Sequence, residues 1–131
     1  MSNLSQTLGV SASGMQAQAQ RLRHVSENIA NADTPGYRRK TVAFDAVVAP
    51  APGSPIMVRP GEVQLDQRAL PQIYEPGHVL ADETGHYFGS NVDPVIEIAD
   101  AREAQRSYEA NLKMFDQAKQ MQQSLIEFLR R

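Results

Sequence analysis

The sequence predicts a mainly α-helical, elongated protein with a small β-rich middle, in which long N- and C-terminal helices pair as an antiparallel coiled coil. Apolar and small residues recur every seven positions near both ends of the 131-residue chain, which is the spacing of helices that pack along a common line of contact. Seven of the eight prolines and five of the eight glycines lie between residues 50 and 94. These residues interrupt helices and favour turns, so the middle of the chain is predicted to be non-helical.

The first predicted helix covers residues 4–31. Small side chains accompany its seven-residue row, so a second helix can approach it closely. No charged side chain occurs between residues 1 and 20, which leaves two interpretations open: a neutral face in water, or a helix with neighbours on several sides. Five residues are assigned to the contact between the two terminal helices, which we call the helix seam: Leu8, Met15, Leu22, Val25 and Ile29.

The first helix is predicted to end in a sharp turn that leads into a strand. Pro35 and Gly36 suit the two central positions of a type II turn. Asn31 can hydrogen-bond the backbone groups that are left free at the helix end. The basic run at residues 38–40 follows the turn. It is either the solvated start of a strand or a contact for an acidic partner.

Alternating apolar and polar residues predict short strands in the middle of the chain. The two longer candidates cover residues 42–48 and 62–66, and residues 73–74 and 87–88 are shorter ones. The prolines and the glycine at residues 50–55 predict a loop between the first two strands.

The last predicted helix covers residues 95–130, with Asp93 as its N-cap and Pro94 in its first turn. At about 1.5 Å per residue it spans roughly 54 Å, which exceeds a compact domain of this size and predicts an elongated molecule. Asn111 lies at a core-like position, where it either fixes the register between the helices or faces an outward groove. Five residues complete the helix seam: Tyr108, Leu112, Phe115, Leu125 and Leu129.

We expect two structural units. Residues 1–36 and 92–131 together are predicted to form a terminal-helix coiled-coil domain. Residues 37–91 are predicted to form a small, β-rich or irregular outer domain.

Composition argues against several classes of function. The chain has no cysteine, so disulfides, thiolate metal sites and cysteine nucleophiles are excluded. A net charge of −2 does not fit a nucleic-acid-binding protein. No apolar run approaches the length of a membrane helix, and the N-terminus lacks the features of a cleavable signal peptide. We therefore expect no nucleic acid, no small-molecule substrate and no transmembrane segment.

His78, Asp82 and His86 recur every four residues and would share one face of a helix. The nearby Pro76 and the glycines of this region favour a loop instead, and no phosphate-binding or metalloprotease motif accompanies the histidines. We expect a protein without catalytic activity, bound metal or cofactor. A small metal-dependent enzyme remains an alternative hypothesis.

Two segments resemble the bacterial flagellar basal-body rod protein family. The N-terminal one contains SGMQAQ at residues 13–18 and SENIANADTPGYRR at residues 26–39. The C-terminal one contains NVDPVIE at residues 91–97 and EAQRSYEANL at residues 103–112. The short chain and the YEPGH segment at residues 74–78 are similar to a proximal-rod member of the family.

The resemblance implies a structural subunit that polymerises helically into the hollow drive shaft, transmits torque and encloses the export channel. It implies contacts with other rod subunits, the export apparatus and ring components. The protein would lie in the basal body and span the periplasm after export without a cleaved signal. A soluble helical adaptor or secretion chaperone is the competing hypothesis. The residues expected to form the family motif and neighbour contacts are Asn28, Asn31, Pro35, Gly36, Tyr37 and Asn111.

Overall fold

The computed structural model describes residues 3–48 and 51–131; Pro50 of the predicted loop therefore lies outside the described residues. The elements follow the predicted order of helix, strands and helix, which confirms the predicted fold class. In chain order they are α1 (Asn3–Ala30), β1 (Lys40–Val48), β2 (Ile56–Leu65), β3 (Gln72–Tyr74), β4 (His86–Phe88) and α2 (Pro94–Arg130).

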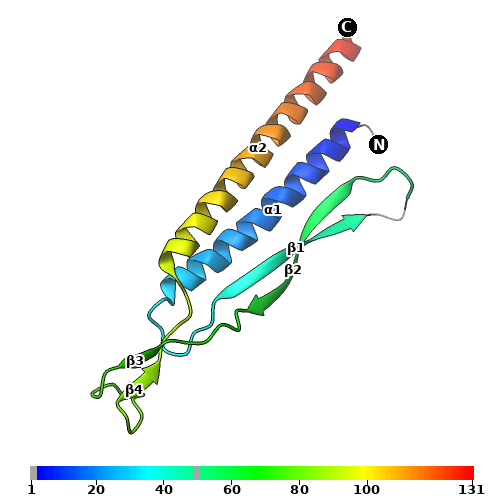
Figure 1. Cartoon of the computed structure of the whole chain (residues 1–131). Helices are drawn as coiled ribbons and strands as arrows, with labels where there is room; N and C mark the ends of the chain where they lie inside the picture. The colour runs from blue at the N-terminus through cyan, green and yellow to red at the C-terminus, as the bar shows by residue number, and fades with distance from the viewer. Residues whose placement is uncertain (1–2, 49–50) are drawn as a thin grey trace.

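The molecule is elongated, and its long axis follows the two helices. α1 and α2 lie side by side and run in opposite directions (Figure 1). The β1–β2 hairpin also runs along α1, while β3 and β4 lie at the end where α1 finishes and α2 starts (Figure 1). With 37 residues, α2 is about 55 Å long and extends past the beginning of α1.

The two predicted helix boundaries in the interior of the chain are confirmed. Asp93 caps α2, because its Oδ1 accepts a hydrogen bond from the Val95 amide at 3.0 Å and Pro94 follows at the first helical position. After α1, Tyr37 donates its amide hydrogen to the Thr34 carbonyl at 3.2 Å. Gly36 has a φ of +73°, which is the conformation that the second central position of a type II turn requires.

The contact between α1 and α2 is made largely by small residues. Ala104 and Ala118 of α2 are 0% and 3% exposed, and Ala17 of α1 is also buried. At Gly14, a Cβ atom would lie only 2.7 Å from the amide nitrogen of Asn111. The Asn111 side chain therefore lies against α1 at this point, and small residues allow the two backbones to approach closely.

The hairpin gives α1 a second neighbour. β1 and β2 are antiparallel, with a register shift between Val42 and Phe44. The Ser13 hydroxyl of α1 accepts a hydrogen bond from the Val58 amide of β2 at 3.2 Å. The uncharged first half of α1 thus lies against both α2 and the hairpin, which supports the second of the two interpretations given above. Within the described residues, neither helix holds an apolar stretch long enough to cross a membrane.

Candidate functional site

Polar residues from α1, β1, α2 and the turn after α1 meet near the point where α1 ends and α2 begins. We call this cluster the polar junction. Residues from both motif segments take part in it, although the two segments lie at opposite ends of the chain. Its members are Arg21, Asn28, Tyr37, Arg39, Lys40, Glu97 and Asp100.

Asn28 is the centre of the polar junction and is only 1% exposed. Its Nδ2 group donates to the Lys40 carbonyl at 2.9 Å and to Glu97 Oε2 at 3.2 Å. Its Oδ1 atom accepts from the Lys40 amide and the Tyr37 hydroxyl, both at 2.9 Å. An amide side chain has two donor hydrogens and one acceptor oxygen with two lone pairs. Every hydrogen-bonding position of Asn28 is therefore used, and the side chain pairs with both backbone groups of Lys40 as a neighbouring strand would.

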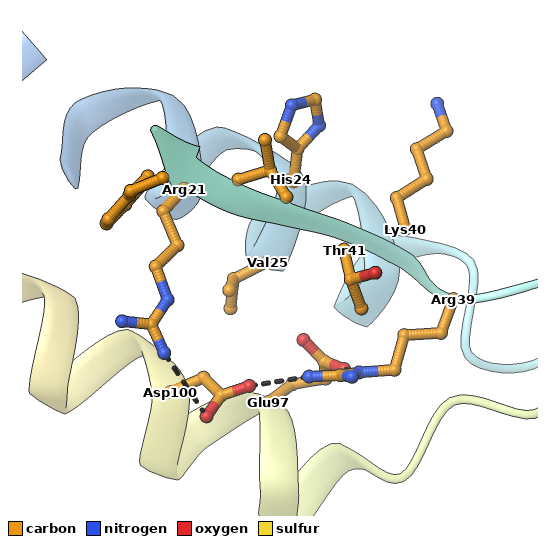
Figure 2. Close-up of a pocket in the computed structure, with 10 residues that line it drawn as sticks. Arg21, His24, Val25, Arg39, Lys40, Thr41, Glu97 and Asp100 are labelled. Atoms are coloured by element: carbon orange, nitrogen blue, oxygen red, sulfur yellow. Dashed lines mark hydrogen bonds and ion pairs between the residues drawn. The ribbon is translucent and has the colours of Figure 1, made fainter. Parts of the chain in front are cut away.

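Glu97 is a carboxylate with no exposed surface. It accepts hydrogen bonds from Asn28 and from the Nε atom of Arg39. Arg39 also donates to Asp100 Oδ2 at 2.5 Å, and Arg21 lies 3.6 Å from the other oxygen of Asp100. Figure 2 shows the two arginines reaching Asp100 from opposite sides. A buried carboxylate is stable only when its charge is compensated and its oxygens are hydrogen-bonded, and this arrangement supplies both conditions.

A cavity of about 260 Å³ lies beside the polar junction, between α1, β1 and α2 (Figure 2). Its charged lining consists mostly of groups that already interact with one another: Arg21 and Arg39 with Asp100, and Lys40 with Glu27 at 2.9 Å. The arrangement therefore holds three elements in a fixed relation. Within the basic run at residues 38–40, Arg39 and Lys40 pair with acidic side chains of the same chain, while Arg38 donates to the backbone carbonyls of Asp66 and Arg68.

His78, Asp82 and His86 lie in and next to the loop between β3 and β4, as the loop interpretation predicted. The His78 ring stacks on Tyr87 with centroids 3.9 Å apart. One oxygen of Asp82 accepts hydrogen bonds from the Thr84 and His86 amides at 2.9 and 3.0 Å. These side chains are engaged in shaping their own loop. In residues 3–48 and 51–131, no three potential ligands gather in a way that would hold a metal ion.

The predicted helix seam is placed unevenly by the structure. Val25 is buried, and Leu8, Met15, Leu22, Tyr108 and Phe115 are half-buried. Ile29 and Leu112 are about two-fifths exposed, whereas Leu125 and Leu129 are 53% and 80% exposed.

The register of the helices explains why Leu125 and Leu129 lie outside the contact between α1 and α2. Asn28 meets Glu97 and Gly14 meets Asn111, so Asn3, the first described residue of α1, falls opposite Gln122. Because the described part of α1 begins at Asn3, no residue of it lies opposite Leu125. The prediction that placed these two leucines in the seam within one subunit therefore differs from the structure.

The remaining predicted motif residues lie at the end of α1. Asn31 donates to the Glu27 carbonyl at 2.8 Å and accepts from the Thr34 hydroxyl. Pro35 is half-buried and Gly36 is exposed.

Sequence reasoning missed the ion pair between Arg39 and Glu97. The available signal was that both residues fall within the two motif segments.

The carboxylates that accept hydrogen bonds predict how stability depends on pH. The hydrogen bond from Lys40 lowers the pKa of Glu27 below its ordinary 4.5, and hydrogen bonds from Arg68 and Thr84 lower the pKa of Asp66 and Asp82 below 3.8. A folded-state pKa below the unfolded value means that the unfolded chain binds more protons in acid. Stability from these groups is thus complete above the ordinary carboxyl values and is lost as the pH falls through the lowered ones.

Urea denaturation at a series of pH values from about 7 to about 3 tests this expectation. The free energy of unfolding should decrease toward the acid end, and a Glu27→Gln variant should show a shallower decrease. An unchanged free energy of unfolding across this range would contradict the assignment.

Comparison with known families gives two matches, one for each motif segment. Residues 8–38 match the family described as "Flagella basal body rod protein". Residues 84–128 match the family described as "Flagellar basal body rod FlgEFG protein C-terminal". The two matched regions contain α1 from residue 8 onward and most of α2. Together they include five of the seven members of the polar junction; Arg39 and Lys40 lie outside them.

Similar proteins extend over nearly the whole chain. The flagellar basal-body rod protein FlgC of Agrobacterium fabrum is 41% identical, and the alignment covers 99% of this chain and 98% of that protein. FlgC of Aquifex aeolicus is 35% identical over 97% and 98% of the two chains. FlgC of Escherichia coli O6:H1 is 37% identical over 86% and 87%. The alignments thus cover most of this chain and most of each relative.

Proposed function

The chain belongs to the flagellar basal-body rod protein family, and from this premise we propose how it acts as a structural subunit of the rod. Its role is mechanical, since the family consists of structural rod proteins and not of enzymes. We place the subunit in the proximal part of the rod, where it polymerises helically with other rod subunits into a hollow shaft that spans the periplasm. The export apparatus and ring components are its further partners in this proposal.

The observation that carries the proposal is the protruding end of α2. Four large apolar side chains there, Leu125, Ile126, Phe128 and Leu129, are all at least half exposed. Large apolar side chains that cluster on a surface mark a contact with another molecule. We assign them to neighbouring subunits. A contact between two different surfaces of adjacent copies builds a helical filament when the rotation from copy to copy does not close a ring.

The polar junction and the paired helices have distinct parts in this mechanism. The junction fixes α1, β1 and α2 relative to one another, so a force on one helix reaches the other. We propose that the paired helices form an inner layer around the export channel and that residues 37–91 form the outer part of the subunit. Asn31, Pro35, Gly36 and Asn111 are our candidates for contacts with neighbouring subunits, because none of them is buried within this one.

Complementation tests the proposed function. An Agrobacterium fabrum strain without its own FlgC should regain swimming when it produces this chain, and the protein should be present in purified basal bodies. Recovery of the protein only in the soluble fraction, without swimming, would contradict the proposal and favour a helical adaptor or secretion chaperone.

Leu129→Asp is expected to separate assembly from folding. Leu129 is 80% exposed, so the free energy of unfolding of the isolated subunit should change by less than about 0.5 kcal/mol. Swimming should be lost, because a charge is placed in the proposed contact. Gln123→Asp, which adds the same charge at an exposed position of the same helix end, is the matched control and should swim. Normal swimming of Leu129→Asp would count against the contact.

A further inference from the structure

The outer edge of β4 is covered by the chain itself. β3 and β4 form a small two-stranded sheet at one end of the molecule (Figure 1). On the side of β4 that faces away from β3, the Phe88 carbonyl accepts a hydrogen bond from the Gly36 amide at 3.1 Å. The His86 carbonyl accepts from the Asp82 amide at 2.8 Å, and the His86 amide donates to Asp82 Oδ1 at 3.0 Å. The turn after α1 and the loop before β4 therefore close this edge.

The outer edge of β3 is open. The Glu75 amide donates to the Gly85 carbonyl at 2.9 Å, and in an antiparallel pair the residues that bond across the ladder alternate with those that do not. The backbone N–H and C=O groups of Gln72 and Tyr74 therefore point away from β4. Among the described residues these groups have no hydrogen-bond partner, and all of β3 is exposed. A strand edge of this kind can pair with a further strand.

The sequence around β3 and β4 is acidic. No lysine or arginine occurs between Arg68 and Arg102, whereas six carboxylates do. Two of these six, Glu97 and Asp100, belong to the polar junction. Excess charge of one sign attracts the opposite charge, so a partner at the open edge is expected to be cationic. The other four carboxylates form no ion pair with any residue that the structure describes: Glu75, Asp82, Glu83 and Asp93.

Large apolar side chains flank the open edge. Ile73 and Tyr74 of β3 are 39% and 66% exposed, and Phe88 of β4 is 56% exposed. Successive side chains of a strand point to opposite faces of the sheet, so an added strand can contact Tyr74 on one face and Ile73 on the other. The edge thus offers unpaired backbone groups, apolar contacts and negative charge together.

We propose that the outer edge of β3 is a docking site for an extended, lysine- or arginine-bearing segment of a different protein, which adds to the small sheet as a third strand. Backbone hydrogen bonds to Gln72 and Tyr74 attach the segment, and its cationic and apolar side chains make the contact selective. A second copy of this chain does not fit the edge. Its exposed cationic cluster at residues 119–131 lies on α2, where the backbone groups are already bonded within the helix. The inference therefore goes beyond the proposed function.

Amide hydrogen exchange of the full chain, measured by NMR with and without a probe peptide, tests this docking. The probe is an end-blocked peptide of eight residues that alternates lysine and valine. With excess probe, the Gln72 and Tyr74 amides should exchange at least about tenfold more slowly, because they become donors in a ladder. The His86 amide already donates to Asp82 and should keep its rate. Unchanged exchange at Gln72 and Tyr74 would overturn the proposal.

Two kinds of variant separate the backbone contact from the charge contact. Gln72→Pro removes an outward N–H group without removing a bond to β4, and it should bind the probe about fivefold or more weakly. Gln72→Ala keeps that amide and is the matched control, which should bind like the parent. Glu75→Gln with Glu83→Gln should also bind more weakly and should make binding less sensitive to salt, because salt screens exposed charges.

Two further peptides complete the test and do not depend on the folding of any variant. A probe with a methyl group on every backbone nitrogen keeps its charge but cannot donate to the edge, and a probe with glutamate in place of lysine carries the wrong charge. Neither should slow exchange at Gln72 or Tyr74. Equal binding of the methylated probe would show a purely electrostatic contact and would refute strand addition. None of these measurements involves swimming, so the complementation experiment decides the proposed function separately.

Discussion

Replacement of Asn28 by leucine is expected to lower the free energy of unfolding by about 3–5 kcal/mol. The Asn28 amide makes four hydrogen bonds while fully enclosed. Leucine has a similar size but offers none of them. The change leaves one Glu97 oxygen and both backbone groups of Lys40 without their partner, and unsatisfied buried groups of this kind cost about 1–3 kcal/mol each, more when charged.

Chemical denaturation of the isolated chain measures this effect, with Gln16→Leu on the exposed side of α1 as the matched control. The control should remain within about 0.5 kcal/mol of the parent. The double variant Asn28→Leu with Glu97→Leu should lose less than the sum of the two single variants, because residues that share a hydrogen bond do not contribute additively. A loss below about 1 kcal/mol for Asn28→Leu would refute the central role of Asn28.

Ala104→Leu is expected to destabilise the helix pair by about 1–3 kcal/mol. Ala104 has no exposed surface and lies seven positions from both Glu97 and Asn111, which contact α1. Three additional carbon atoms have no space there, so the helices must separate or the side chain must adopt a strained rotamer.

The matched control for Ala104→Leu is Ala110→Leu, which makes the same change on the exposed side of α2. Thermal denaturation monitored by circular dichroism compares the two. The control should keep the melting temperature of the parent, while Ala104→Leu should lower it. Equal melting temperatures would mean that the contact between the helices is not closely packed.

The sequence predicted the helices well because their signals are local. Asp93 and Pro94 determine the start of α2 within one turn, and the Pro35–Gly36 turn determines the end of α1. The seven-residue rows correctly indicated that the two helices would pair. Each of these signals depends on residues that are near one another in the chain.

The parts that were not predicted depend on contacts between distant residues. Arg39 and Glu97 are 58 positions apart, so no local sequence pattern predicts their ion pair. The leucines at the end of α2 continue the heptad rows, but the length of the partner helix decides whether they are covered. Likewise, Ala17, Ala104 and Ala118 are buried in the helix pair, although large apolar residues are the usual guide to such a contact.

The order of the polar junction along the chain has a consequence for synthesis. Asn28 and its partner Glu97 are separated by 69 positions, so a nascent chain that emerges N-terminus first completes the first helix, the turn and the hairpin long before the carboxylate is available. Contacts between distant residues slow folding because a long loop must close before they form. In a partly emerged chain the hydrogen bond between Asn28 and Glu97 is therefore still missing. The two helices can pair through the polar junction only after α2 has begun to leave the ribosome.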